Sequence, residues 1–87
     1  MDYEMPIGNE TIEDLIDYYN HNHDIFFIYN GKEYCLCCEK EEDFIQDGLK
    51  DANILYRSKH GKAMTDIIID GMPLQEVLQK SYIDSIY

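Results

Sequence analysis

The sequence predicts a small α+β protein: a single domain over residues 1–87 with an N-terminal helix, an antiparallel β-hairpin within a small sheet, and a C-terminal helix. Three local patterns favour this fold class. An apolar stripe with helical spacing occupies residues 12–19, an Asn-Gly dipeptide divides two runs rich in aromatic and β-branched residues, and Pro73 precedes a second apolar stripe. With 45% hydrophobic residues, the chain has enough apolar material to fold.

The first helix is expected to begin at Thr11, after a lead-in at residues 1–9 that we expect to be loosely ordered. Thr11 and Asp14 have the spacing of a capping box. The apolar positions that follow share one helix face, at Ile12, Leu15, Ile16 and Tyr19.

The hairpin is expected at about residues 24–29 and 32–38, because the Asn-Gly dipeptide between them suits the positive φ angles of a type I′ turn. A two-residue turn fixes the pairing of the strands, so Phe27 should face Tyr34. This first face of the hairpin is expected to pack on the helices.

The second face of the hairpin is also apolar, since it carries Phe26, Ile28 and Cys35. A single layer of helices would cover only the first face, so the second must be covered by another segment or by a partner. Phe26, Ile28 and Cys35 therefore form the predicted self-association surface of a possible homodimer.

The second half of the chain carries weaker signals. Residues 40–52 are acidic and weakly helical, and the sequence leaves helix and loop open for them. The remaining elements are expected as a short strand at 53–58, a short helix or strand at 63–69 ending in an Asp-Gly turn, a helix at about 73–80 and a closing strand at 81–87. In the closing strand, Tyr82, Asp84 and Ile86 should share one side and Ile83 and Ser85 the other.

Two stretches of the chain, IFFIYNGKEYCL and IIIDGMPLQEVL, together resemble a loose group of short acidic proteins from bacteria and their phages. Proteins of that group begin with a short helix, continue with a hairpin that turns on Tyr-Asn-Gly-Lys, and end with Ile-Asp-Gly and a short helix. The resemblance implies the same order of elements here. It also makes the second hairpin face unusual, because positions equivalent to Phe26 and Ile28 are polar in most of that group.

The three cysteines, Cys35, Cys37 and Cys38, do not predict a metal site or a redox centre. A zinc site could draw on His21 and His23 beside Cys37 and Cys38, but adjacent strand residues point to opposite faces and the Cys-x-x-Cys spacing is absent. Cys35 and Cys37 share a face, yet a disulfide between them in a flat strand would be poorly placed. We expect cysteines that act as small strand hydrophobes, and no metal or other cofactor.

Catalysis is not indicated either. His60, with Ser58 and Asp66 near it in sequence, has the residue types of a triad, but the chain lacks a nucleophile elbow, a phosphate-binding glycine loop and metal-ligand spacing. We therefore expect a non-enzymatic protein with no catalytic residues.

The excess negative charge lies in the first part of the chain. Residues 1–51 hold 14 acids and 3 bases, whereas residues 52–87 hold four of each, and the whole chain carries a net charge of −11. Such a surface repels nucleic acid and anionic membranes and attracts basic surfaces. No apolar run of membrane-spanning length or secretory signal is apparent and the cysteine count is odd, so we expect a protein of the cytoplasm.

Small size and strong acidity are similar to those of phage-encoded inhibitors that mimic nucleic acid, anti-CRISPR proteins among them. We therefore expect an acidic binding protein that occupies a basic, nucleic-acid-binding protein surface by charge mimicry. The alternatives left open are a face that only aids solubility and a small oligomerisation module. The predicted partner-binding residues are the acids of two segments: Glu13, Asp14, Asp17, Glu39, Glu41, Glu42, Asp43, Asp47 and Asp51.

Overall fold

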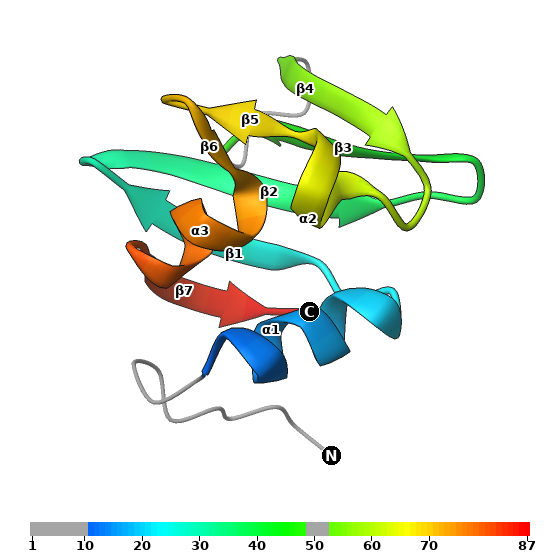
Figure 1. Cartoon of the computed structure of the whole chain (residues 1–87), viewed down its shortest axis with the longest axis horizontal. Coiled ribbons are helices and arrows are strands. Elements are labelled where there is room, and N and C mark those ends of the chain that lie inside the picture. Colours follow the sequence, from blue (N-terminus) through cyan, green and yellow to red (C-terminus); the bar gives the residue numbers. More distant parts are fainter. Residues whose placement is uncertain (1–10, 49–52) are drawn as a thin grey trace.

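A five-stranded antiparallel sheet forms the base of the protein, in a computed structural model that describes residues 11–48 and 53–87. The strand order across the sheet is β4-β3-β2-β1-β7 (Figure 1). The strands are β1 (Ile25–Tyr29), β2 (Lys32–Cys38), β3 (Glu42–Asp47), β4 (Ile54–Lys59) and β7 (Tyr82–Ile86). The α+β fold class that the sequence predicts is confirmed. The loose order expected for residues 1–9 falls outside the described residues.

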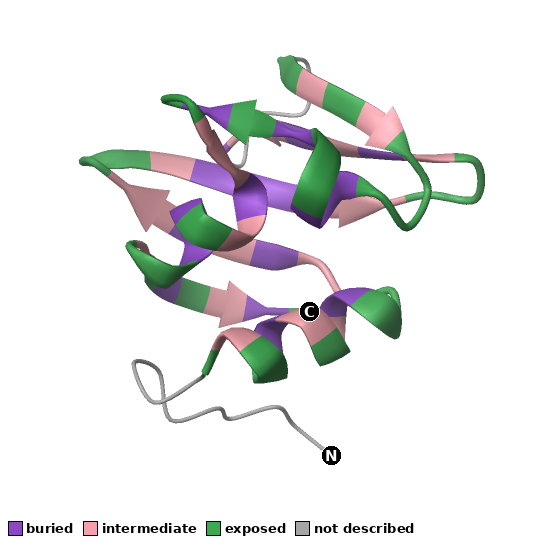
Figure 2. Ribbon diagram, viewed as in Figure 1, coloured by how far each residue is buried: buried purple, intermediate pink, exposed green. Residues whose placement is uncertain are grey.

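Three short helices and a two-stranded hairpin lie over one face of this sheet (Figure 1). They are α1 (Ile12–Asn20), α2 (Ala63–Asp66), α3 (Leu74–Gln79) and the hairpin of β5 (Ile68–Ile69) and β6 (Met72–Pro73). The core fills the space between the two layers, and Figure 2 shows its buried residues on both. None of the described helices is long and apolar enough to span a membrane.

The capping box at the start of α1 forms as predicted. The Thr11 hydroxyl accepts a hydrogen bond from the Asp14 N–H at 3.2 Å, and the Asp14 carboxylate accepts one from the Thr11 N–H at 3.1 Å. The apolar stripe turns Leu15 and Tyr19 into the core, so the charged positions of α1 remain on its outer face.

The β1–β2 hairpin also forms in the predicted register. Asn30 and Gly31 have φ angles of 55° and 80°, as a type I′ turn requires, and Phe27 pairs with Tyr34. The rings of Phe27 and Tyr34 stack with their centroids 5.3 Å apart on the core side. The predicted C-terminal helix is α3, which buries Leu74, Val77 and Leu78.

A second hairpin lies above the sheet and was only partly expected. Residues 63–69 form both of the structures that the sequence left open, α2 first and then β5. Asp70 and Gly71 then adopt φ angles of 56° and 77° and turn the chain into β6. The Tyr29 hydroxyl donates to the Asp70 carboxylate at 3.0 Å, which joins the first hairpin to the second.

The expectation of helix or loop for residues 40–52 is wrong where the structure describes them, because β3 occupies Glu42–Asp47. Its burial alternates, with Asp43 and Ile45 fully buried and their neighbours partly exposed. The free edge of β2 decides the conformation, since β3 pairs with it from Tyr34↔Asp47 to Cys38↔Asp43. The paired residues are 5 to 13 positions apart in the chain, and their pairing outweighs the weak helical pattern.

The facing predicted for the closing strand is also wrong. Ile83 and Ile86 are both 5% exposed, although a regular strand would place them on opposite faces. The pairing with β1 shifts between Phe26 and Phe27, which pair with Ser85 and Ile83 and leave Asp84 as an extra residue. This bulge resets the alternation and lets both isoleucines reach the core.

Candidate functional site

The outer face of α1 carries three exposed acids, Glu13, Asp14 and Asp17, and the helix contains no Lys or Arg. Glu13 and Asp14 lie in the first turn, where the helix dipole favours negative charge. Asp17 lies beyond it, with its carboxylate 3.7 Å from the Nδ1 of His21. Because the opposite stripe is buried, these carboxylates face solvent as a group, which we call the α1 acidic face.

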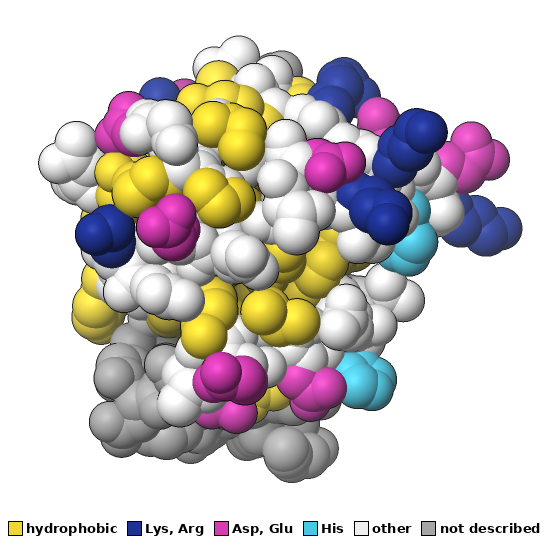
Figure 3. Space-filling model, in the orientation of Figure 1, with side chains coloured by type: hydrophobic (Ala, Val, Ile, Leu, Met, Phe, Trp, Pro, Cys, Tyr) yellow, Lys and Arg dark blue, Asp and Glu magenta, His cyan; other side chains and the backbone are white. Residues whose placement is uncertain are grey.

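The acids that follow the first hairpin lie in a different electrostatic setting. Glu39 and Glu41 are exposed in the β2–β3 turn, but Glu42 forms an ion pair with Arg57 at 2.6 Å and pairs in register with Lys59. Figure 3 shows Lys and Arg beside Asp and Glu at this end of the sheet, on the right of the view. The charge-balanced second half of the chain therefore supplies cations to β3, through β4. Asp47 is half-buried on β3, and Asp51 lies outside the described residues.

Asp43 is not on the surface at all, which contradicts its predicted role in binding a partner. Its carboxylate is fully buried and accepts hydrogen bonds from the Tyr19 hydroxyl and from the Gly61 N–H, the latter at 2.8 Å. The Nδ1 of His60 lies 3.0 Å from the other carboxylate oxygen. The physical reason is strand alternation, since Asp43 shares the core face of β3 with Ile45.

Tyr19 completes a buried polar junction around Asp43. Its hydroxyl donates to Asp43 and accepts a hydrogen bond from the Ala63 N–H at 2.9 Å. Burial, together with the hydrogen bond to Asp43, raises the pKa of Tyr19. The junction ties α1, β3 and the turn before α2 to one another. No local pattern in the sequence predicts this junction, because the three segments are far apart along the chain.

A hollow of about 390 Å³ beside this junction has both Cys38 and His60 in its lining. With Asp43 behind His60, the residue types are those of a cysteine hydrolase. The Cys38 sulfur, however, lies 3.9 Å from the carbonyl oxygens of both Tyr19 and His23, and either oxygen can accept its single S–H. Burial and the charge of Asp43 raise the pKa of Cys38 to about 12, so the sulfur stays a protonated, poor nucleophile.

The other groups weighed for chemistry are separated. The carboxylate next to His60 is Asp43, whereas the Asp66 carboxylate accepts from its neighbour Thr65. Within residues 11–48 and 53–87, no three His, Cys, Asp or Glu side chains are grouped as a metal site. The Cys38 thiol and the Cys37 thiol also engage different groups, on opposite sides of β2.

The second face of the sheet carries the predicted self-association residues. Phe26 and Ile28 are half-buried there, but Cys35 is only 1% exposed and lies beneath its neighbours, so it cannot contact a partner directly. Two tyrosines extend the apolar surface: Tyr82 pairs with Ile28 and is 57% exposed, and Tyr87 packs its ring edge-on to Phe26 and is 72% exposed.

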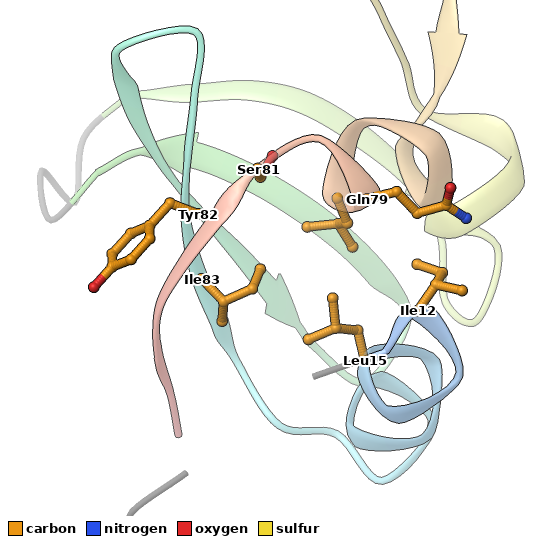
Figure 4. Close-up of a pocket in the computed structure, with 7 residues that line it drawn as sticks. Ile12, Leu15, Gln79, Ser81, Tyr82 and Ile83 are labelled. Carbon is orange, nitrogen blue, oxygen red and sulfur yellow. The ribbon is translucent and has the colours of Figure 1, made fainter. Parts of the chain in front are cut away.

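A smaller hollow of about 170 Å³ opens beside α1, between this helix, α3 and β7 (Figure 4). In Figure 4, Ile12 and Leu15 face Ile83 across it. Ligand sites in proteins span about 300–1,000 Å³, so this hollow has room for one aliphatic side chain and not for a cofactor.

Comparisons with known protein families, with curated proteins and with solved structures find no match to this chain. The resemblance to short acidic proteins of bacteria and phages therefore stays a prediction, and the assignment of function depends on the geometry of the site.

Proposed function

We propose that the protein is a non-enzymatic binding protein whose α1 acidic face docks on a basic surface of another protein, a surface that otherwise holds nucleic acid. The observation that carries the proposal is the exposure of Glu13, Asp14 and Asp17 on a helix that has no Lys or Arg. Residues one helical turn apart have Cβ atoms about 5–6 Å from each other, a spacing similar in scale to that of successive phosphates. A row of this kind suits an Arg- or Lys-lined groove.

The choice of α1 over the β2–β3 acids follows from their neighbours. Asp43 is buried in the polar junction, Glu42 is paired with Arg57, and the exposed Glu39 and Glu41 flank Lys40, so this segment offers less uncompensated negative charge than α1. The hollow beside α1 can also accept one apolar side chain of the partner protein. The mode of action is that of the phage-encoded, anti-CRISPR-like inhibitors that the acidity of the chain resembles.

Two double variants of equal charge change test the proposal. Glu13→Gln with Asp17→Asn neutralises the α1 acidic face and leaves Asp14 in its capping box, whereas Glu39→Gln with Glu41→Gln neutralises exposed acids of the β2–β3 turn. The tagged wild-type protein and both variants are used to capture proteins from a bacterial extract, and each captured protein is then tested for nucleic-acid binding.

We expect the wild type and the β2–β3 variant to capture the same nucleic-acid-binding protein, and the α1 variant to lose it. Bound protein should elute with salt, and nucleic acid should compete for it. If both variants lost the captured protein equally, net charge alone would explain the binding. If the α1 variant still captured it, the assignment of binding to the α1 acidic face would be refuted. A captured protein that binds nucleic acid undisturbed in the complex would refute the mimicry.

A second candidate function is self-association through the second sheet face, favoured by the exposed Tyr82 and Tyr87 beside Ile28 and Phe26. Tyrosines with this exposure next to apolar strand residues are typical of protein interfaces. Sedimentation at high concentration tests it. We expect a dimer that Ile28→Ser and Phe26→Ser convert to a monomer, and a wild type that remains monomeric throughout would eliminate this candidate.

A further inference from the structure

Cys35 and Cys37 lie on the second face of β2 with their Sγ atoms 3.4 Å apart. Two residues along a strand span about 6.4–6.8 Å, which is at the upper end of the Cα separation that a disulfide allows. The sequence alone therefore argued against a link between them. The structure brings the two sulfur atoms into hydrogen-bond contact, at a place that neither the polar junction nor the α1 acidic face uses.

The two thiols differ in access and in ionisation. Cys35 is 1% exposed, whereas Cys37 is partly exposed. The hydrogen bond from Cys35 lowers the pKa of Cys37, against the opposing effects of burial and of Asp24 and Glu39. The same bond and burial raise the pKa of Cys35. Cys37 is therefore the sulfur that ionises first and that a reagent can reach.

We propose that Cys35 and Cys37 form a reversible redox site, in which Cys37 reacts with a small disulfide of the glutathione class and Cys35 resolves the product. The Cys37 thiolate attacks one sulfur of the small disulfide, forms a mixed disulfide and releases one small thiolate. Cys35 then loses its proton, attacks the Cys37 sulfur of the mixed disulfide and releases the second small thiolate. Two protein thiols are oxidised, one small disulfide is reduced, and both protons end on the released thiols.

The bridged form would alter the middle of the sheet. The sulfur atoms must close to about 2.05 Å, so β2 has to contract between Cys35 and Cys37. β2 is the central strand, and these two residues pair with Phe26 on β1 and Phe44 on β3. A strained disulfide is readily reduced again, so the site would act as a reversible switch and not as a permanent structural disulfide.

Reaction of the reduced protein with oxidised glutathione, followed by acid quenching and intact mass measurement, tests the proposal. We expect the wild type and Cys38→Ala to lose two hydrogens each and to remain single chains. Cys35→Ala should stop at a mixed disulfide on Cys37, formed at least about tenfold faster than any adduct on Cys37→Ala. Peptide mapping of the wild type at early times should find glutathione on Cys37.

Three results would overturn the proposal: a bridge that includes Cys38, oxidation that only joins two chains, or adducts that form as fast on Cys37→Ala as on Cys35→Ala. The early peptide mapping uses only the wild type, so it identifies the cysteine that reacts first even if a substitution at the buried Cys35 impairs folding. Circular dichroism of each reduced variant checks the fold, and Cys35→Ser provides a second substitution at that position.

Discussion

The acids of α1 and the acids of β3 look alike in the sequence but have different surroundings in the fold. On α1 the helical period places the acids opposite the apolar stripe, so all three remain exposed without a Lys or Arg on the same helix. On β3 the two-residue period of a strand directs Asp43 into the core, and the neighbouring β4 brings Arg57 to Glu42. The net charge of a segment therefore does not show how much charge it exposes. The exposed charge depends on whether the segment is a helix or a strand and on the charges of the adjoining strand.

The largest difference between the two regions is expected in stability. Asp43→Ala removes the acceptor of the Tyr19 hydroxyl and the Gly61 N–H, and it should lower the free energy of unfolding by about 3–5 kcal/mol. The matched change Asp17→Ala on α1 should stay within about 0.5 kcal/mol. Denaturant unfolding of both variants measures this, and similar losses in the two would mean that the buried contacts of Asp43 do not stabilise the fold.

Tyr19 lies on α1, but its hydroxyl donates a hydrogen bond to Asp43 on β3. Tyr19→Phe leaves the Ala63 N–H and one acceptor site of the Asp43 carboxylate without their partner, at a cost of about 1–3 kcal/mol. The control is Tyr82→Phe on the exposed second face, for which we expect a change within about 0.5 kcal/mol. Equal effects in a thermal unfolding experiment would mean that the hydroxyl of Tyr19 has no structural role.

The capping box gives a smaller effect, confined to α1. Thr11→Ala removes the hydroxyl that accepts from the Asp14 N–H and should cost about 1 kcal/mol, whereas Thr11→Ser should retain most of the stability. Hydrogen exchange of the first turn of α1 reports the loss locally. Unchanged protection in Thr11→Ala would show that packing of Leu15 and Tyr19 alone fixes this end of the helix.

Asp24, just before β1, is intermediate between the exposed and the buried acids. Burial raises its pKa above the ordinary value of 3.8, against a hydrogen bond from the Cys38 backbone. The folded state thus favours the neutral form, and ionisation costs stability as the pH rises through the folded pKa. We expect Asp24→Asn to unfold at a slightly higher temperature than the wild type near neutrality, with the gain disappearing below pH 3.8. A gain that persists unchanged in acid would contradict this sign.

Local patterns were enough to predict the parts of the fold that depend on neighbouring residues. The Thr11 capping box and the Asn30-Gly31 turn each involve residues close in sequence, and both form as expected. β3 was missed because its conformation is decided by pairing with β2. The facing of β7 failed because a bulge opposite β1 shifts its alternation.

Only the part of the candidate site that follows from helix geometry was predictable from the sequence. The outward direction of Glu13 and Asp17 follows from the stripe of α1, and the structure places both on the surface. The hydrogen bonds that the buried Asp43 carboxylate accepts come from Tyr19 and Gly61, which lie 24 and 18 residues away in the chain. No local pattern reports a contact of that kind.

The proposed function requires that the α1 acidic face, and not the β2–β3 turn, binds a basic partner. The most direct measurement is the salt dependence of the dissociation constant between the captured partner and three proteins: the wild type, Glu13→Gln with Asp17→Asn, and Glu39→Gln with Glu41→Gln. We expect binding to weaken steeply with salt for the wild type and the β2–β3 variant, and to depend only weakly on salt for the α1 variant. A steep dependence that the α1 variant retains and the β2–β3 variant loses would contradict it.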